Sequence, residues 1–315
     1  MKALYFDKEL KLLDNVSIPR KPDEALIRIT MAGVCNTDLE IIKGYMGFKG
    51  ILGHEFIGIV EESNNKDFIG KRVCGEINCP CGNCYFCENN MPTHCPNRTV
   101  LGIFNRDGVF CEYTTLPEKN LYVLEDYIED EVAVFVEPIA AAYEILEQIS
   151  IKPTDNIIIL GDGKLGLLIA KVISLFTKNL LVVGKHENKL NILKNTGINT
   201  KLLDQIDNLT ANIIIESTGS PQGISLALNT VCPRGTIVLK TTIADNFNIN
   251  LSKAVINEIN IIGSRCGPFK PAIKALKNNL IDVKPLITEI FDFDNAIEAV
   301  KKAQQKDSLK VLLRL

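Results

Sequence analysis

The chain has 315 residues, of which 35 are basic and 38 acidic, so its formal net charge is −3. This length predicts two domains, and the near-neutral charge offers no basic face for a phosphate backbone, which argues against nucleic acid as a partner. The longest apolar runs fall far short of the ~20 residues of a bilayer span, and the N-terminus has no apolar signal core. We therefore expect a cytoplasmic protein with no membrane partner.

The first part of the chain is punctuated by Gly, Pro and Asn and has the pattern of short strands. Between residues 25 and 31, Ala25, Ile27, Ile29 and Met31 alternate with Leu26, Arg28 and Thr30. An alternation with a period of two is typical of a strand with one buried face. We therefore expect a mostly β domain over residues 1–139.

Three separated motifs in this domain carry residues that bind metals. Cys35 follows Gly33-Val34, His54-Glu55 follows Gly53, and Glu137 precedes Pro138. Taken singly, Cys35 could be a buried small hydrophobe, His54 a core histidine and Glu137 a surface or capping carboxylate. Together they offer sulfur, nitrogen and oxygen ligands to zinc with room for a substrate or water, as a catalytic site requires.

Four of the ten cysteines lie close together in a loop of about residues 79–96. In a long chain without a signal peptide, cysteines more often bind metal than form a disulfide framework. The spacing Cys81-x2-Cys84-x2-Cys87-x7-Cys95 would complete the tetrahedral coordination of zinc and leave no open position, which indicates a structural ion. The alternatives are incidental reduced thiols or an iron–sulfur cluster.

The character of the chain changes after about residue 140. Unbroken apolar runs at Ile157–Leu160, Leu180–Val183, Ile213–Ile215 and Ile237–Leu239 are separated by segments of helical length. Such runs are typical of a parallel sheet buried on both faces, so we expect a doubly wound α/β domain over residues 140–265. Residues 266–315, with helices expected at 271–278 and 295–304 and a strand at 311–315, resemble the first part again.

A glycine motif directly follows the first of these apolar runs. The segment Gly161-Asp162-Gly163-Lys164-Leu165-Gly166 precedes a helix-like stretch at 167–176. In this setting the glycines permit a tight turn, close approach to a pyrophosphate and close packing of helix on strand. A glycine-rich turn without a ligand is the alternative, but the flanking strand and helix favour a Rossmann domain that binds a dinucleotide.

The turn after the second apolar run bears on which dinucleotide is bound. NAD-binding domains usually place an acidic residue about 20 positions after the glycines, where it binds the adenine ribose. Here the turn reads Gly184-Lys185-His186, and a cation in place of the acid suits a 2′-phosphate. We therefore favour NADP over NAD, although Lys185 and His186 could be solvated turn residues and Glu187 lies close by.

These motifs together resemble the zinc-containing medium-chain dehydrogenases, which include alcohol, sorbitol, threonine and glucose dehydrogenases. The resemblance covers essentially the whole chain and rests on five motifs in the family's order: Cys35-x-Thr37-Asp38, Gly53-His54-Glu55, the four-cysteine loop, Glu137-Pro138 and the glycine motif. It implies a GroES-like catalytic domain interrupted by the Rossmann domain, with residues 266–315 returning to the catalytic part. It also implies a homodimer or homotetramer.

The resemblance assigns roles to individual residues. Cys35 and His54 are implied as ligands of the catalytic zinc, with Glu137 at a position where polyol-type members have glutamate. Glu55 is implied as a further ligand or one that exchanges with substrate. Asp38 resembles the carboxylate that orients the zinc histidine, and Thr37 the hydroxyl that relays the proton. The cofactor would contact Gly161, Gly163, Leu165, Gly166, Gly184, Lys185 and His186, and Cys81, Cys84, Cys87 and Cys95 would hold a second, structural zinc.

Two departures from the family limit what can be transferred. The histidine that continues the proton relay in some alcohol dehydrogenases is absent, because the only histidines are His54, His94 and His186. The stretch 44–53 is short for the family, which would reshape the substrate pocket.

We expect an enzyme that interconverts an alcohol or polyol hydroxyl and its carbonyl, passing hydride to NAD(P) through a zinc-bound alkoxide. One alternative is a non-catalytic NAD(P)-binding sensor or scaffold, which loss of Cys35 or His54 would have indicated. Another is a different divalent ion at the same ligands.

Overall fold

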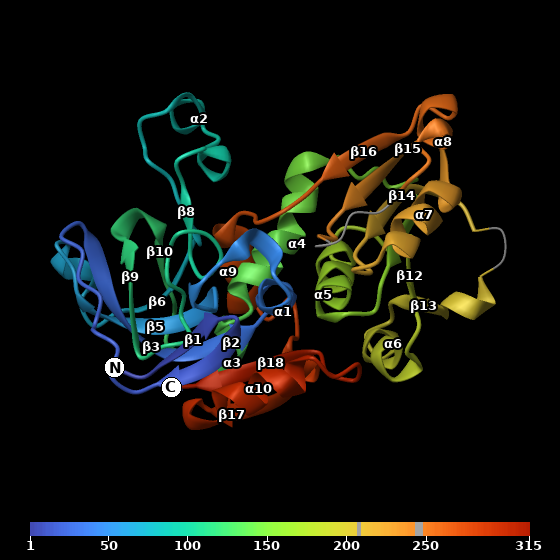
Figure 1. Ribbon diagram of the computed structural model, residues 1–315. Coiled ribbons are helices and arrows are strands. Elements are labelled where there is room, and N and C mark those ends of the chain that lie inside the picture. The colour runs from blue at the N-terminus through green and yellow to red at the C-terminus, as the bar shows by residue number, and fades with distance from the viewer. Residues whose placement is uncertain (207–208, 243–247) are drawn as a thin grey trace. The chain divides into compact units, whose positions relative to one another are not determined.

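The computed structural model describes residues 1–206, 209–242 and 248–315 (Figure 1). These residues form two compact units. Unit 1 comprises residues 1–137 and 287–315, and unit 2 comprises residues 138–286. The return to the first unit, expected at residue 266, therefore comes at 287. The intervening segment packs within unit 2, where the backbone of Gly267 lies directly against the carbonyl of Ala140.

Unit 1 is mostly β, as the alternating pattern predicts. Its largest sheet has the order β10-β6-β5-β3-β18-β17, and β9 also pairs with β3. These strands are β3 (Glu24–Val34), β5 (Glu55–Glu62), β6 (Arg72–Gly75), β9 (Tyr113–Pro117), β10 (Leu121–Val123), β17 (Ile287–Asp292) and β18 (Lys310–Arg314). A smaller sheet contains β2 (Glu9–Leu13), β1 (Ala3–Asp7) and β4 (Gly50–Ile51) in that order.

The C-terminal strand completes the larger sheet of unit 1. Strand β18 pairs antiparallel with β3, with Leu313 opposite Ala32, and parallel with β17. The end of the chain therefore adds side chains to the core around β3. The helices of this unit are α1 (Asn36–Ile42), α2 (Tyr85–Glu88), α3 (Asp130–Ala133) and α10 (Ala296–Ala303), while α4 (Val136–Gln148) runs from unit 1 into unit 2.

A projecting lobe leaves unit 1 through the two-stranded ribbon of β7 (Asn78–Cys79) and β8 (Thr99–Val100), and its tip contains α2 (Figure 1). Single 3-10 turns complete the described elements of the chain: η1 (Tyr45–Gly47), η2 (Lys66–Phe68), η3 (Pro92–His94), η4 (Glu118–Asn120), η5 (Leu203–Gln205), η6 (Lys284–Leu286) and η7 (Phe293–Asn295).

Unit 2 contains a parallel six-stranded sheet of order β13-β12-β11-β14-β15-β16. Numbered from β11, this is the order 3-2-1-4-5-6 of the doubly wound Rossmann fold. The strands are β11 (Ile157–Leu160), β12 (Leu180–Gly184), β13 (Asn199–Leu202), β14 (Ala211–Glu216), β15 (Val231–Leu239) and β16 (Asn260–Gly263). The expected α/β class and the four buried apolar strands are therefore confirmed.

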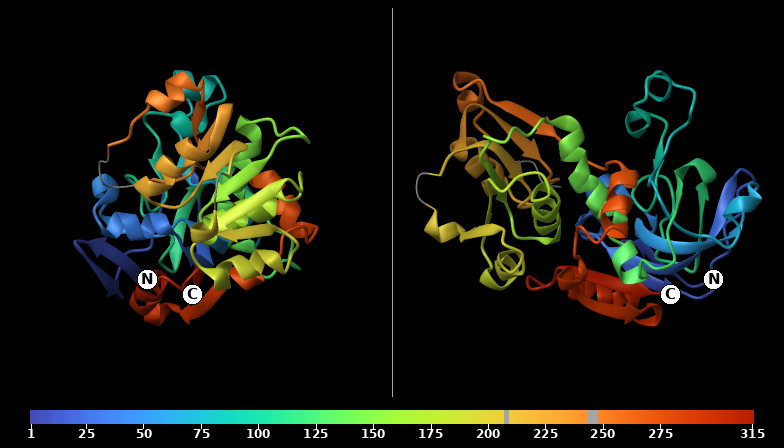
Figure 2. Two further views of the ribbon diagram at one scale, coloured as in Figure 1. Left: turned by 90° about the vertical axis from the view of Figure 1, so that its right-hand side faces the viewer. Right: turned by 180° about the vertical axis from the view of Figure 1, so that it is seen from behind.

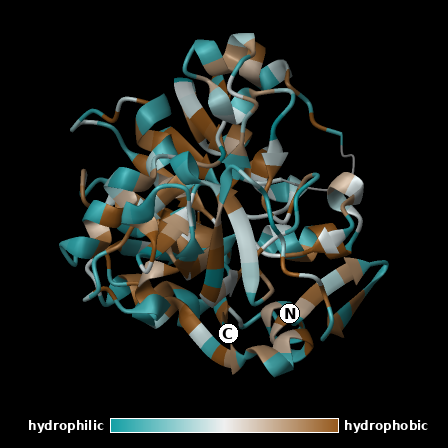
Figure 3. Ribbon diagram, turned by 90° about the vertical axis from the view of Figure 1, so that its left-hand side faces the viewer, coloured by the Kyte–Doolittle hydropathy of each residue, from teal (hydrophilic) through white to brown (hydrophobic). Residues whose placement is uncertain are grey.

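Helices flank the sheet of unit 2 (Figure 2). The helices of this unit are α5 (Lys164–Ile173), α6 (Glu187–Lys194), α7 (Pro221–Thr230), α8 (Ser252–Ile256) and α9 (Phe269–Lys277), and of these α5, α6 and α7 pack against the strands. Ile158, Leu160, Ile214 and Ile237 lie in one buried cluster with residues of α7. Hydrophobic stretches follow the strands, while many peripheral loops are hydrophilic (Figure 3). In the part of the chain that the structure describes, no helix has the length and hydropathy needed to cross a membrane.

Candidate active site and cofactor turn

The first metal-binding motif lies where β3 ends and α1 begins. Cys35 is the N-cap of α1, and its backbone N–H donates to Asp38 Oδ2 at 2.8 Å. The Sγ of Cys35 lies 3.7 Å from Thr37 Oγ1. Asp38 is fully buried, so the capping interaction fixes a carboxylate inside the unit and holds Cys35 and Thr37 on the same turn.

The second motif immediately precedes β5. Gly53 has a φ of +93°, and its N–H donates to Asp38 Oδ1 at 3.2 Å. The same oxygen lies 3.2 Å from His54 Nδ1, although these two atoms are not aligned as a hydrogen bond. Asp38 therefore links the Cys35 turn to the His54 turn.

The structure brings Cys35, His54 and Glu55 together. One ligand atom from each lies within 4.8 Å of the others. His54 is 2% exposed and Glu55 1% exposed; His54 Nδ1 faces Asp38, while among the described residues Glu55 Oε1 has no hydrogen-bond partner. Buried polar atoms without partners are costly unless a ligand satisfies them. A thiol, an imidazole and a carboxylate so placed fit a zinc ion, whose bonds to such ligands are about 2.0–2.3 Å long.

Charges around His54 favour its protonated form when no metal competes. Burial alone would lower the pKa of His54, but Asp38 and Cys35 raise it well above its usual range. A metal ion bound to His54 would have to displace this proton, so its binding would depend on pH.

Glu137, the fourth expected ligand, is the second residue of α4. It lies outside the group of ligand atoms that are within 4.8 Å of one another. Burial raises its pKa to about 7, with His54 opposing the rise and Glu55 adding to it. Glu137 therefore interacts electrostatically with the site without joining the three-residue group.

Lys310 is a residue of this site that the sequence analysis missed. It lies in β18, is 1% exposed, and its ammonium forms an ion pair with Glu55 Oε2. It also lies 5.5 Å from the ring centroid of Phe135. Burial alone would lower the pKa of Lys310, but the negative charge of Glu55 raises it. The available signal was a single lysine within the apolar run 309–313.

The four cysteines of the lobe converge on one point. Sγ–Sγ distances are 3.5 Å for Cys84–Cys87 and Cys81–Cys95, 3.7 Å for Cys84–Cys95 and 4.0 Å for Cys81–Cys87. Sulfurs bonded to a central zinc at about 2.3 Å stand roughly 3.8 Å apart at the corners of a tetrahedron. None of the four is in a disulfide. The spacing fits a single ion better than a cluster in which each sulfur binds a different iron.

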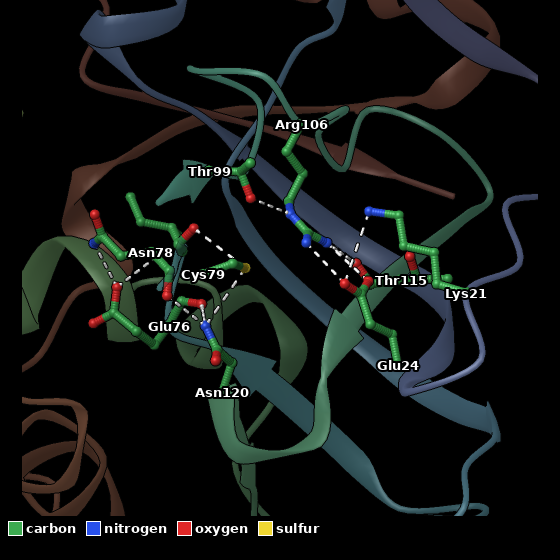
Figure 4. Close-up of polar contacts among 10 residues, drawn as sticks. Lys21, Glu24, Glu76, Asn78, Cys79, Thr99, Arg106, Thr115 and Asn120 are labelled. Carbon is green, nitrogen blue, oxygen red and sulfur yellow. Dashed lines mark hydrogen bonds and ion pairs between the residues drawn. The ribbon is translucent and has the colours of Figure 1, made fainter. Parts of the chain in front are cut away.

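Polar contacts at the base of the lobe anchor it to the large sheet (Figure 4). Arg106 Nε donates to Thr99 Oγ1 at 2.9 Å, and its two terminal nitrogens each donate to Glu24 at 2.8 Å. Asn120 Nδ2 donates to the carbonyl oxygens of Glu76 and Asn78, both at 2.7 Å. The ribbon that carries the cysteines is thus fixed at β7 and at β8.

In unit 2, the glycine motif forms the turn between β11 and α5. Gly161 has a φ of +118°, which favours glycine. A Cβ at Gly166 would meet the Gly161 carbonyl oxygen at 2.2 Å, so glycine permits the close approach of α5 to the strand. A Cβ at Gly163, the N-cap of α5, would meet no described atom within 4 Å. The backbone is therefore open at the helix N-terminus, where a pyrophosphate would bind.

The comparisons with known proteins agree with this geometry. Residues 21–126 match the model of the alcohol dehydrogenase GroES-like domain, and residues 130–315 match that of the glucose dehydrogenase C-terminus. The chain is 27% identical to the starvation-sensing protein RspB of Escherichia coli, covering 99% of both chains. It is 25% identical to D-arabinitol dehydrogenase 1 of Uromyces fabae, covering 100% of this chain and 97% of that protein.

A solved structure of the RspB dehydrogenase of E. coli CFT073, complexed with NADH, superposes with a TM-score of 0.91 at 26% identity. The match covers 100% of this chain and 99% of that one. A GroES-like unit with a zinc-type ligand group and a Rossmann unit with a dinucleotide turn define a metal-dependent, nicotinamide-linked dehydrogenase. The chain belongs to the zinc-containing medium-chain alcohol and polyol dehydrogenases, which confirms the family that the five motifs predict.

Proposed function

We propose that this protein oxidises a hydroxyl of an alcohol or polyol, or reduces the corresponding carbonyl, with zinc and NAD(P) as cofactors. The observation that carries the proposal is the group of Cys35, His54 and Glu55 around one point, in which His54 and Glu55 are buried. Bound zinc would act as a Lewis acid that lowers the pKa of a substrate hydroxyl, and NAD(P) would accept the hydride. The similarity to D-arabinitol dehydrogenase 1 of Uromyces fabae supports a polyol as the substrate class.

The residues of unit 1 have distinct roles in this proposal. Cys35 and His54 would bind the zinc, while Asp38 orients His54 and fixes the Cys35 turn. Glu55 would bind the zinc through Oε1, because Lys310 already pairs with Oε2. Thr37 would take the hydroxyl proton, since its Oγ1 lies beside Cys35 Sγ. Glu137 would act as an alternate zinc ligand. It lies outside the group of Cys35, His54 and Glu55, but the charges of His54 and Glu55 act on its carboxyl group.

We propose a second, structural zinc in the lobe, held by Cys81, Cys84, Cys87 and Cys95. The Sγ–Sγ distances and the absence of disulfides among these cysteines support it. Each chain would then bind two zinc ions. A lobe of this length has few apolar side chains of its own, so the metal would supply the cross-link that keeps it folded.

The cofactor would bind at Gly161, Gly163, Leu165 and Gly166, where the backbone is open at the start of α5. Lys185 and His186 were the basis for expecting NADP rather than NAD. In the structure, however, His186 Nδ1 lies 3.0 Å from a carboxylate oxygen of Asp162, which belongs to the neighbouring β11–α5 turn. An imidazole engaged by this carboxylate is less suited to bind a 2′-phosphate.

We further propose a homodimer or homotetramer in the cytoplasm. Strand β16 is an edge strand of its sheet, and Val255 and Ile256 of the neighbouring α8 are each 77% exposed. An open edge beside exposed apolar side chains is a surface that a second copy would cover. The ten free cysteines suit a reducing compartment. Sedimentation of the protein and of a Val255→Glu variant would test the dimer, and a monomeric wild-type protein would contradict it.

The proposed function is tested by turnover of a panel of alcohols, polyols and their carbonyls with each nicotinamide cofactor, together with elemental analysis. We expect activity with at least one polyol and about two zinc ions per chain. Two zinc ions with cofactor binding but no turnover on any panel member would favour a sensor instead. Activity in protein free of zinc would refute the mechanism.

A further inference from the structure

Asp162 is the second residue of the glycine motif, and its side chain reaches from the β11–α5 turn to the end of β12. The two strands are neighbours in the parallel sheet, with Leu160 opposite Val183. Asp162 Oδ2 accepts hydrogen bonds from the backbone N–H groups of Lys185, at 2.7 Å, and His186, at 2.6 Å. Only 8% of Asp162 is exposed. Its carboxylate is therefore fixed at the turn that follows β12.

Gly184 makes room for this carboxylate. A Cβ at residue 184 would lie 2.5 Å from Asp162 Cβ and 2.6 Å from Oδ2. Residue 184 ends β12, at the turn where NAD-binding Rossmann domains place the acidic residue that binds the adenine ribose. The sequence has no acidic residue at this usual position directly after β12. Asp162 of the neighbouring β11–α5 turn supplies a carboxylate there instead, in the space that a side chain at residue 184 would need.

The basic side chains at the turn after β12 lie close to acidic residues, so they do not form an isolated basic patch. His186 Nδ1 lies 3.0 Å from Asp162 Oδ2, so the imidazole is engaged by the carboxylate. Lys185 and Glu187, which stand two positions apart and carry opposite charges, are both exposed. The hydrogen bonds that Lys185 and His186 make with Asp162 all reach Oδ2, which leaves Oδ1 able to accept one from a ligand. A buried, oriented carboxylate has more influence on a bound ligand than exposed, screened side chains.

We propose that Asp162 selects NAD(H) over NADP(H), a proposal that rests on the proposed function. Its Oδ1 accepts a hydrogen bond from a hydroxyl of the adenine ribose, and its negative charge repels a 2′-phosphate. Asp162 therefore replaces the acid usually found at the end of the second strand, and Lys185 does not form a phosphate site. The assignment reverses the preference inferred from the sequence of the turn alone.

The test measures dissociation constants of NADH and NADPH for the zinc-loaded full-length protein, from the change in nicotinamide fluorescence on binding. We expect wild-type protein to bind NADH at least about tenfold more tightly than NADPH. The Asp162→Asn variant keeps an acceptor oxygen but loses the charge, so the ratio of the two constants should fall by about tenfold. Tighter binding of NADPH by the wild-type protein would overturn the proposal.

Two further variants keep the test independent of the folding of Asp162→Asn. Glu187→Gln removes the same charge from the exposed side of the turn and should change the ratio less than about twofold. An effect as large as that of Asp162→Asn would overturn the proposal. The double variant Asp162→Ser, Gly184→Asp moves the carboxylate to the end of β12 and should restore the NADH preference. A double variant that binds both cofactors equally would contradict the assignment.

Failure of this proposal can be told apart from failure of the proposed function. If neither NADH nor NADPH binds, the protein is not a nicotinamide-linked enzyme and both proposals fail. If both bind and Asp162→Asn leaves their ratio unchanged, only the role of Asp162 fails.

Discussion

Lys310 and Glu55 form an ion pair in which each side chain is only 1% exposed. The partners are far apart in sequence, because Lys310 lies in the C-terminal strand β18 and Glu55 begins β5. The pair uses one oxygen of the carboxylate and leaves Oε1 without a hydrogen-bond partner among the described residues. Lys310 thereby holds Glu55 in place beside Cys35 and His54.

Removing one member of this pair should cost much more stability than removing both. Lys310→Met leaves a buried carboxylate without its counter-charge, and we expect a loss of about 3–5 kcal/mol in the free energy of unfolding. The double variant Lys310→Met, Glu55→Gln should recover much of that loss. The measurement is urea unfolding followed by circular dichroism, which suits a chain without tryptophan. If the double variant loses as much free energy of unfolding as the two single variants together, the two residues are not coupled.

Cys35→Ala should abolish turnover and leave cofactor binding intact. The thiolate is a proposed zinc ligand in unit 1, while the glycine turn lies in unit 2. We expect a loss of at least about a thousandfold in kcat/KM, equivalent to about 4 kcal/mol of transition-state stabilisation, and one zinc fewer per chain. Cys111→Ala, at a buried cysteine outside both groups, is the matched control. Unchanged activity in Cys35→Ala would defeat the proposed site.

Cys87→Ser should affect stability before it affects chemistry. It removes one of four sulfurs that stand 3.5–4.0 Å apart in the lobe, so the structural zinc should be lost or weakly held. We expect a lower Tm and one zinc fewer, with residual turnover in the protein that stays folded. A normal Tm with one zinc fewer would contradict a structural role for that ion.

Stability should depend on pH through the contact between Glu24 and Arg106. Burial alone would raise the pKa of Glu24, but hydrogen bonds from Arg106 and Thr115 lower it overall. A carboxyl group whose pKa is lowered on folding stabilises the folded state above its ordinary pKa, and this contribution is lost as the pH falls through the lowered pKa. Glu24→Gln should therefore cost about 3 kcal/mol at neutral pH and less in acid.

The measurement is the unfolding midpoint between pH 7 and pH 3. Glu62→Gln, which breaks an exposed pair with Arg20, is the matched control and should leave the midpoint nearly unchanged at each pH. An equal loss for Glu24→Gln at pH 7 and pH 3 would show that the ion pair does not provide this stability.

Local pattern was sufficient to predict four of the six strands of unit 2. The expected strands at 157–160, 180–183, 213–215 and 237–239 appear as β11, β12, β14 and β15, because strands buried on both faces must be apolar throughout. The expected helices at 271–278 and 295–304 correspond to α9 and α10 within two residues at each end. The four-cysteine lobe was equally visible, since its ligands are close together in the chain.

The sequence by itself determined the family, the two kinds of domain and the residue types that could hold metal, because each depends on short-range spacing. Only the tertiary structure decided which charges face one another. Pairing of β18 with β3 brings Lys310 to Glu55, and parallel pairing of β11 with β12 brings Asp162 to the turn after Gly184. The sequence around each residue does not indicate its partner in either contact. The partners are brought together by strand pairing between segments that are distant in the chain.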